Sequence, residues 1–155
     1  MKFNISTALL ATALLATGCA NNTDGQDGGG ISDGPAVPGS SQDFRNSVND
    51  RVHFGYDKSD ISSEASTTLS EQSAWLKQYP NVNVTLEGHA DVRGTREYNL
   101  ALSEKRAINT KHALRAAGVE AGRMDTNALG KDQLVAEGDN EETHQANRVV
   151  ITQPR

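Results

Sequence analysis

Apolar and polar residues alternate through the segment NVNVTL at 81–86. Because successive side chains of a strand point to opposite faces, this alternation places Val82, Val84 and Leu86 on one face. The pattern predicts a half-buried strand. Shorter segments bounded by turn-forming residues predict three further strands, at 51–54, 125–129 and 148–152.

A helical pattern lies between the first two of these strands. It starts at Ser62 or Ser63, either of which can cap a helix, and it stops before Pro80. Its apolar residues recur at the spacings of three, four and seven that one helix face requires, namely at Ala65, Leu69, Leu76 and Tyr79.

A second, longer helix is predicted from about Arg96 to Ala117, with Gly118 as its C-cap. Its apolar residues recur every seven positions and are predicted to face the sheet, at Leu100, Ala107 and Leu114. The predicted order is therefore β-α-β-α-β-β. This order is typical of an α/β (α+β) sandwich, with helices packed on one mixed sheet.

The N-terminal segment MKFNISTALLATALLATGCAN has the layout of a secretory signal, predicted here to be residues 1–18. One positive residue, Lys2, precedes a mostly apolar run of 12 residues from Ile5 to Ala16. A membrane-spanning helix needs about 20 such residues. The run is therefore better interpreted as a signal segment that is removed than as a membrane anchor.

Cys19 is the only cysteine, so the chain forms no internal disulfide. The segment LATGC at 15–19 resembles a bacterial lipobox, in which the cysteine is acylated and becomes the mature N-terminus. Leu15 stands one position earlier than the usual leucine. Ala20, in place of an aspartate, favours the outer membrane, and several acyl chains would make that anchoring nearly permanent.

A linker is predicted after this cysteine, over residues 19–42. Six Gly, two Pro and three Asp among residues 20–41 leave too little apolar surface to offset the entropy of ordering. The folded domain is predicted at 43–155, which is long enough for one modest core.

Charge narrows the possible partners. The chain has 15 basic and 20 acidic residues, a net charge of -5, and its basic residues are dispersed. A nucleic-acid-binding surface is therefore not supported.

The segment GHAD at 88–91 follows the strand predicted at 81–86 and raises a question of chemistry. His89 and Asp91 share a strand face and could bind a metal, with His53, His112 or His144 as a third ligand. No metal-binding or nucleophile motif accompanies them, so no cofactor is predicted and an enzyme is not favoured. A histidine that is buried and hydrogen-bonded at the end of the strand is the simpler interpretation of His89. A periplasmic metal hydrolase that uses His89 and Asp91 stays as a remote alternative function.

Charge recognition is the remaining interpretation. Asp91 and Arg106 are 15 positions apart, and a strand-turn-helix return could bring them to one pocket. A carboxylate facing a guanidinium suits a zwitterion, because the first binds an ammonium and the second a carboxylate. Spacing alone leaves open that the two residues pair with each other or with solvent.

Several motifs resemble the OmpA-like peptidoglycan-binding domain family, and among its members the peptidoglycan-associated lipoproteins of Gram-negative bacteria. The resemblance covers the whole predicted domain. The motifs are VHFGYDKSDI at 52–61, EGHADVRGTREYN at 87–99, LALSEKRA at 100–107, LGKD at 129–132 and NRVV at 147–150.

This resemblance implies a non-enzymatic protein that binds meso-diaminopimelate in the stem peptides of peptidoglycan. It implies an ammonium partner at Asp91 and a carboxylate partner at Arg106. It further implies site positions at Asn99, at Asp57 and Phe54 in a loop that walls the site, and at Arg93.

The same resemblance implies a place in the cell. The acyl group would hold the outer membrane while the domain holds the wall, as part of the Tol system of envelope integrity and cell division, with the TolB propeller as a partner. An OmpA-like lipoprotein that anchors an assembly without Tol partners is the alternative. The sequence departs from the usual motifs at Val92, Ser103 and Val149.

Overall fold

The computed structural model describes residues 36–155. The predicted signal segment, Cys19 and most of the predicted linker lie outside the described residues. Within 36–155 there is no helix with the length and apolar character to cross a bilayer.

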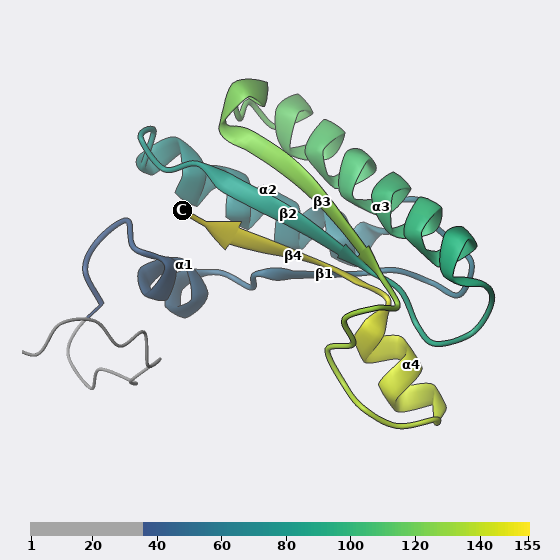
Figure 1. Cartoon of the computed structure of the whole chain (residues 1–155). Helices are drawn as coiled ribbons and strands as arrows, with labels where there is room; N and C mark the ends of the chain where they lie inside the picture. The colour runs from purple at the N-terminus through teal and green to yellow at the C-terminus, as the bar shows by residue number, and fades with distance from the viewer. Residues whose placement is uncertain (1–35) are drawn as a thin grey trace, which may run out of the picture. The chain divides into compact units, whose positions relative to one another are not determined.

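One four-stranded sheet forms the centre of the domain (Figure 1). Its strands lie in the order β1-β4-β2-β3, and β4 runs antiparallel to both neighbours whereas β2 and β3 are parallel. The predicted mixed sheet is therefore confirmed. The strands are β1 (Arg51–His53), β2 (Val84–His89), β3 (Met124–Gly130) and β4 (Val149–Pro154).

The alternating segment at 81–86 located β2 but not its ends. The strand begins three residues later than predicted and continues to His89, so it includes the first two residues of GHAD. Those residues stay in the sheet because Gly88 pairs with both β3 and β4.

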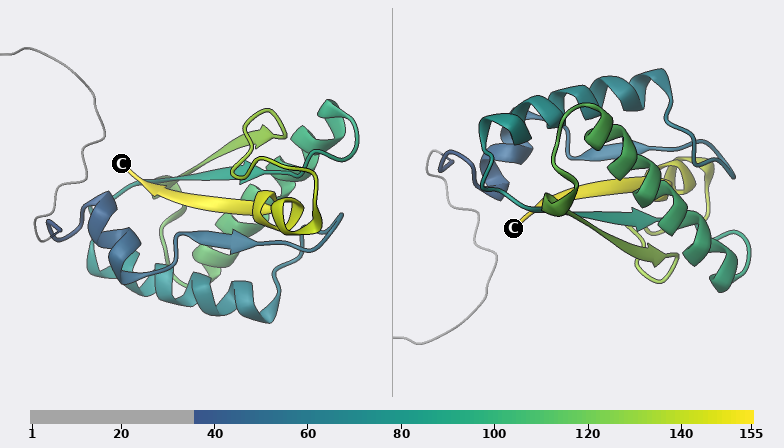
Figure 2. Two further views of the ribbon diagram at one scale, coloured as in Figure 1. Left: turned by 90° about the horizontal axis from the view of Figure 1, so that it is seen from below. Right: turned by 90° about the horizontal axis from the view of Figure 1, so that it is seen from above.

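Both predicted helices are confirmed as α2 (Ser63–Gln78) and α3 (Arg96–Ala116), and they cross the same face of the sheet (Figure 2). The Ser62 hydroxyl caps α2 by accepting from the amide of Ala65. Thr95 caps α3 in the same way. The core lies between these helices and the sheet, with Leu69, Leu76, Val84, Leu86, Ala107 and Leu114 among its buried side chains.

One prediction for the α3 face is wrong. Leu100 does not share the burial of Ala107 and Leu114, and 36% of it is exposed. Ser103 and Arg106 are buried instead. The sheet-facing side of α3 therefore becomes polar toward its N-terminus, which a search for apolar periodicity does not register.

Two short helices and a single turn were missing from the predicted order. They are α1 (Ser41–Ser47), α4 (Glu141–Asn147) and the 3-10 turn η1 (Ala121–Arg123). Helix α1 is capped by Ser40 and begins two residues before the predicted domain start. Its only buried residue, Phe44, packs against Trp75 with 4.9 Å between ring centroids. Seven-residue helices carry too few apolar positions to show a period.

Candidate functional site

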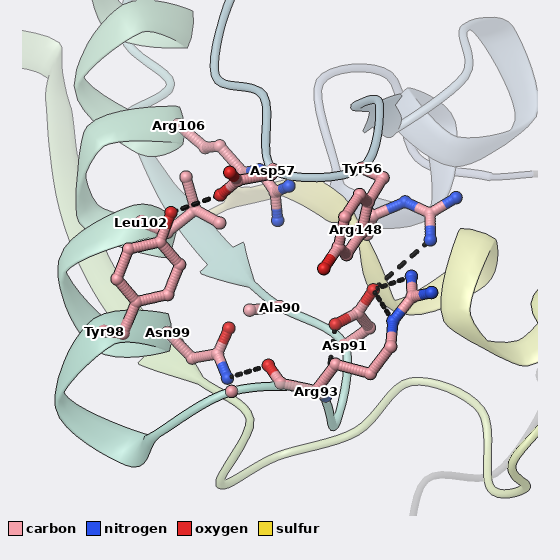
Figure 3. A pocket seen from close by; sticks show the side chains of 11 residues that line it. Tyr56, Asp57, Ala90, Asp91, Arg93, Tyr98, Asn99, Leu102, Arg106 and Arg148 are labelled. Atoms are coloured by element: carbon pink, nitrogen blue, oxygen red, sulfur yellow. Dashed lines mark hydrogen bonds and ion pairs between the residues drawn. The ribbon is translucent and has the colours of Figure 1, made fainter.

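A cavity of about 150 Å³ opens where β2 ends and α3 begins (Figure 3). Three segments build it: the loop after β1, the turn between β2 and α3, and the first three turns of α3. Arg148, directly before β4, completes the wall. The lining residues are Tyr56, Asp57, Ala90, Asp91, Arg93, Gly94, Tyr98, Asn99, Leu102, Arg106 and Arg148.

Asp91 lies on one side of this cavity and is buried, with 5% of it exposed. Its Oδ2 accepts hydrogen bonds from Arg93 Nη2 at 2.6 Å and Arg148 Nη1 at 3.3 Å. Burial by itself raises the pKa of Asp91, but the two guanidinium groups outweigh it and hold the pKa below its ordinary value. Asp91 is therefore an ionised carboxylate at neutral pH.

Helix α4 supplies a second carboxylate to the same network. Glu141 accepts from Arg148 Nη2 at 2.8 Å and from Arg93 Nη1 at 3.4 Å. Arg93 also lies over the ring of Tyr56, with 4.3 Å to the ring centroid. The negative charges of the two acids thus balance the positive charges of the two arginines. Asp91 is held in place by Arg93 on one side and Arg148 on the other.

Arg106 lies on the other side of the cavity and is held differently. It is 1% exposed, and it donates to three backbone carbonyls: Lys58 O at 2.9 Å, His89 O at 3.1 Å and Gly55 O at 3.2 Å. Burial lowers the pKa of Arg106 to about 10, partly offset by the negative charge of Asp91. The guanidinium therefore keeps its positive charge at neutral pH, without an ion pair among residues 36–155.

The loop after β1 is fixed against α3. Asn109 donates to the Ser59 carbonyl at 2.7 Å, and the Tyr98 hydroxyl donates to Asp57. Asp57 has a φ of 55°, which is uncommon for a residue other than glycine, although aspartate is among those that tolerate it. Asp57 is among the residues that line the cavity.

Phe54 does not line the cavity. It is 2% exposed and belongs to the core, where the Arg106 guanidinium lies 5.3 Å from its ring centroid. Phe54 supports the position of Arg106 and has no free edge toward a ligand.

Asn99 lines the cavity and also shapes its floor. Its amide Nδ2 donates to the Arg93 carbonyl at 2.7 Å, across the turn that leads into α3. Gly94 in that turn has a φ of 90°, a conformation that side chains disfavour. Asn99 thereby fixes the backbone that carries Arg93.

The three departures from the family motifs have visible places. Ser103 is fully buried, and its hydroxyl accepts from the Gly130 amide at 3.0 Å, so it links α3 to the end of β3. Val149 is buried in the sheet opposite His53 and is not among the residues that line the cavity. The backbone carbonyl of Val92 accepts from Lys131 at 3.2 Å.

His89 does not project into the cavity. It is 5% exposed, and its Nδ1 lies 2.9 Å from the Gln133 carbonyl. In residues 36–155 no three histidine, cysteine, aspartate or glutamate side chains are grouped as metal ligands. His89 is therefore a buried histidine with a hydrogen-bond partner at Nδ1.

Sequence reasoning missed Arg148, Tyr56, Tyr98 and Glu141 as site residues. Arg148 stood within the motif NRVV, but nothing in the sequence placed the start of the last strand beside GHAD. The partner of Arg148 on α4 was hidden because that helix was not predicted.

Comparison with known proteins shows the family of this chain. The family model described as the OmpA family matches residues 53–148. The peptidoglycan-associated lipoprotein of Agrobacterium fabrum is 44% identical over 154 residues, which are 96% of this chain and 86% of that protein. The chain belongs to the OmpA family.

Other members of the family support the assignment. A peptidoglycan-associated lipoprotein of Rhizobium meliloti is 45% identical over 94% of this chain and 84% of its own length. The crystal structure of the peptidoglycan-associated lipoprotein from Burkholderia pseudomallei has a TM-score of 0.67 at 33% identity, covering 69% of this chain and 91% of that one. The resemblance inferred from the motifs is confirmed.

A more distant structure shows the fold alone. The C-terminal domain of Helicobacter pylori MotB superposes with a TM-score of 0.64 at 18% identity, over 68% of this chain and 84% of that one.

Proposed function

We propose that this protein is an outer-membrane lipoprotein that binds peptidoglycan without covalent attachment and so tethers the membrane to the wall. Its relatives named peptidoglycan-associated lipoprotein match most of the chain. In this proposal Cys19 carries the acyl anchor and the domain faces the periplasm. The protein then acts by binding, with no catalytic step.

The ligand proposed for the cavity is the free end of meso-diaminopimelate in a stem peptide. This end carries an ammonium and a carboxylate on one carbon. The observation that carries the proposal is the presence of an ionised carboxylate, Asp91, and a charged guanidinium, Arg106, in the lining of one cavity. The cavity of about 150 Å³ suits the end of one residue rather than a whole stem peptide.

Arg106 is the proposed partner of the ligand carboxylate. A guanidinium has more N–H donors than the three that Arg106 uses on backbone carbonyls. Its remaining donors can meet a carboxylate without loss of an internal bond. Asp91 is the proposed partner of the ammonium, and its Oδ1 accepts only a long 3.3 Å bond from the Arg93 amide.

The free energy of the proposed hydrogen bonds is sufficient for a reversible tether. Hydrogen bonds to charged groups contribute about 1.5 to 3 kcal/mol each. Three such bonds approach the roughly 8 kcal/mol that micromolar affinity needs, and association costs reduce that sum. Many copies along one polymer then add avidity, so each contact can be weak while the two layers stay joined.

The TolB propeller of the Tol system is the proposed protein partner. Its support is the similarity to peptidoglycan-associated lipoproteins, and co-purification with TolB from the native membrane tests it. A preparation that yields the wall but never TolB would favour an envelope anchor outside the Tol system.

Co-sedimentation of the purified full-length protein with peptidoglycan tests the main proposal. We expect binding to diaminopimelate-type peptidoglycan, little binding to lysine-type peptidoglycan, and competition by free meso-diaminopimelate. The lysine-type stem lacks the second carboxylate, so it leaves Arg106 without a partner. Equal binding to both wall types would refute the assignment of the cavity.

A further inference from the structure

A second cavity of about 230 Å³ adjoins the first along α3. The two cavities share Asp57, Tyr98 and Leu102 in their linings. The hydrogen bond from Tyr98 to Asp57 forms the divide between them, and Figure 3 shows it at the edge of the first cavity. A peptide ligand is longer than one residue. If it extends from the first cavity toward the second, it passes over the hydrogen bond between Tyr98 and Asp57.

The walls of the second cavity are held in place by the protein itself. One wall is the α3 face that carries Tyr98, Ala101, Leu102 and Lys105, positions that fall on one side of a helix. The opposite wall is the loop with Ser59. Arg106 and Asn109 fix that loop to α3 through the carbonyls of Lys58 and Ser59, so the groove exists before a ligand binds.

The end of this cavity away from Asp57 offers two hydrogen-bond donors that suit an anion, from Lys105 and Ser59. Lys105 brings an ammonium, and in the described part of the chain that ammonium takes part in no hydrogen bond or ion pair. Ser59 supplies a hydroxyl group. Within residues 36–155 this hydroxyl likewise has no hydrogen-bond partner. The one carboxylate in the lining, Asp57, lies at the divide and is engaged by Tyr98.

We propose that the second cavity binds a free carboxylate on a residue next to diaminopimelate in the same stem peptide, with Lys105 and Ser59 as its donors. This inference rests on the proposed function, because it places diaminopimelate in the first cavity. The neighbouring carboxylate can belong to the residue before diaminopimelate or to the one after it. Both sources offer the same group to Lys105.

Calorimetric titration of the full-length protein in detergent tests the inference. The ligands are free meso-diaminopimelate, a stem peptide with free carboxylates, and two peptides amidated at either the preceding residue or the C-terminus. The variant is Lys105→Gln. Lys111→Gln is the matched control, since it removes the same charge from the same helix outside both cavities.

We expect Lys105→Gln to weaken binding of the free-carboxylate peptide roughly two- to fivefold, as for an exposed ion pair, and more at low salt than at high salt. Free diaminopimelate should bind the variant and the parent equally. One of the two amidated peptides should bind the parent as weakly as the free peptide binds the variant, which identifies the source of the carboxylate.

Two failures are distinguishable. If free diaminopimelate does not bind the parent protein, the proposed function fails. If it binds, but neither amidation nor Lys105→Gln changes peptide affinity beyond the Lys111→Gln control, the second subsite is refuted while the first cavity keeps its role.

Discussion

Arg106 and Arg148 are both buried at the same cavity, yet they are neutralised in different ways. Arg148 contacts two carboxylates, Asp91 and Glu141. Arg106 donates only to backbone carbonyls among residues 36–155. Burying a charge without a paired counter-charge is costly, and the three carbonyl acceptors offset part of that cost for Arg106. Arg148 thus holds the protein's own carboxylates in place, and Arg106 is the guanidinium that we propose for the ligand carboxylate.

The largest effect should follow from Arg106→Ala. Truncating one partner of a buried charge pair costs about 2 to 5 kcal/mol, so affinity for diaminopimelate should fall by roughly 30-fold to several thousand-fold. Calorimetry measures this loss. Because three carbonyls also lose their donor, the free energy of unfolding should fall as well.

Arg106→Lys helps to separate the loss of affinity from the loss of folding stability. It keeps the charge while losing the planar set of donors. If Arg106→Lys and Arg106→Ala both bound diaminopimelate as the parent does, while circular dichroism showed them folded, the comparison between the two arginines would have no functional meaning.

A smaller effect should follow from Asp91→Asn. The amide oxygen still accepts from the ligand ammonium, but the charge is gone, so affinity should fall roughly 30-fold, within the range for a charged hydrogen bond. Glu141 continues to pair with Arg148, so the fold should survive. Equilibrium titration at low and at moderate salt measures the change, and Asp125→Asn on the remote edge strand is a control of the same chemistry. An unchanged affinity in Asp91→Asn would assign the ammonium to another group.

The smallest effect should come from mild acid. The folded pKa of Asp91 is below its ordinary value near 3.8, so its contribution to stability and binding is complete above that value. It is lost only as pH falls through the lowered folded pKa. Affinity should therefore change less than about twofold between pH 7 and pH 5 and should decline only below about pH 4.

Asp91→Asn provides the reference for this pH series. The variant has no proton to gain at this position, so its affinity should vary less with acid than that of the parent. A parent protein that already lost most of its affinity at pH 5 would show that another group controls binding.

The sequence determined more of the fold than of the site. The alternation around β2 and the apolar spacing of α2 and of the C-terminal half of α3 follow from local rules, because each buries an apolar face. Helices α1 and α4 were not predicted, because they are stabilised by caps and by contacts with distant elements and not by a repeating apolar face. The Ser40 and Asn140 side chains cap them, yet such residues also occur in many turns.

For the site, the sequence by itself placed Asp91, Arg93, Asn99 and Arg106 in one stretch and supplied their chemistry. Only the tertiary structure decided their partners. Arg148 lies 57 positions from Asp91, and the Gly55 carbonyl lies 51 positions from Arg106. Phe54 was expected in the wall and is instead in the core beneath Arg106. Such outcomes depend on the order of all four strands in the sheet, and no local pattern encodes that order.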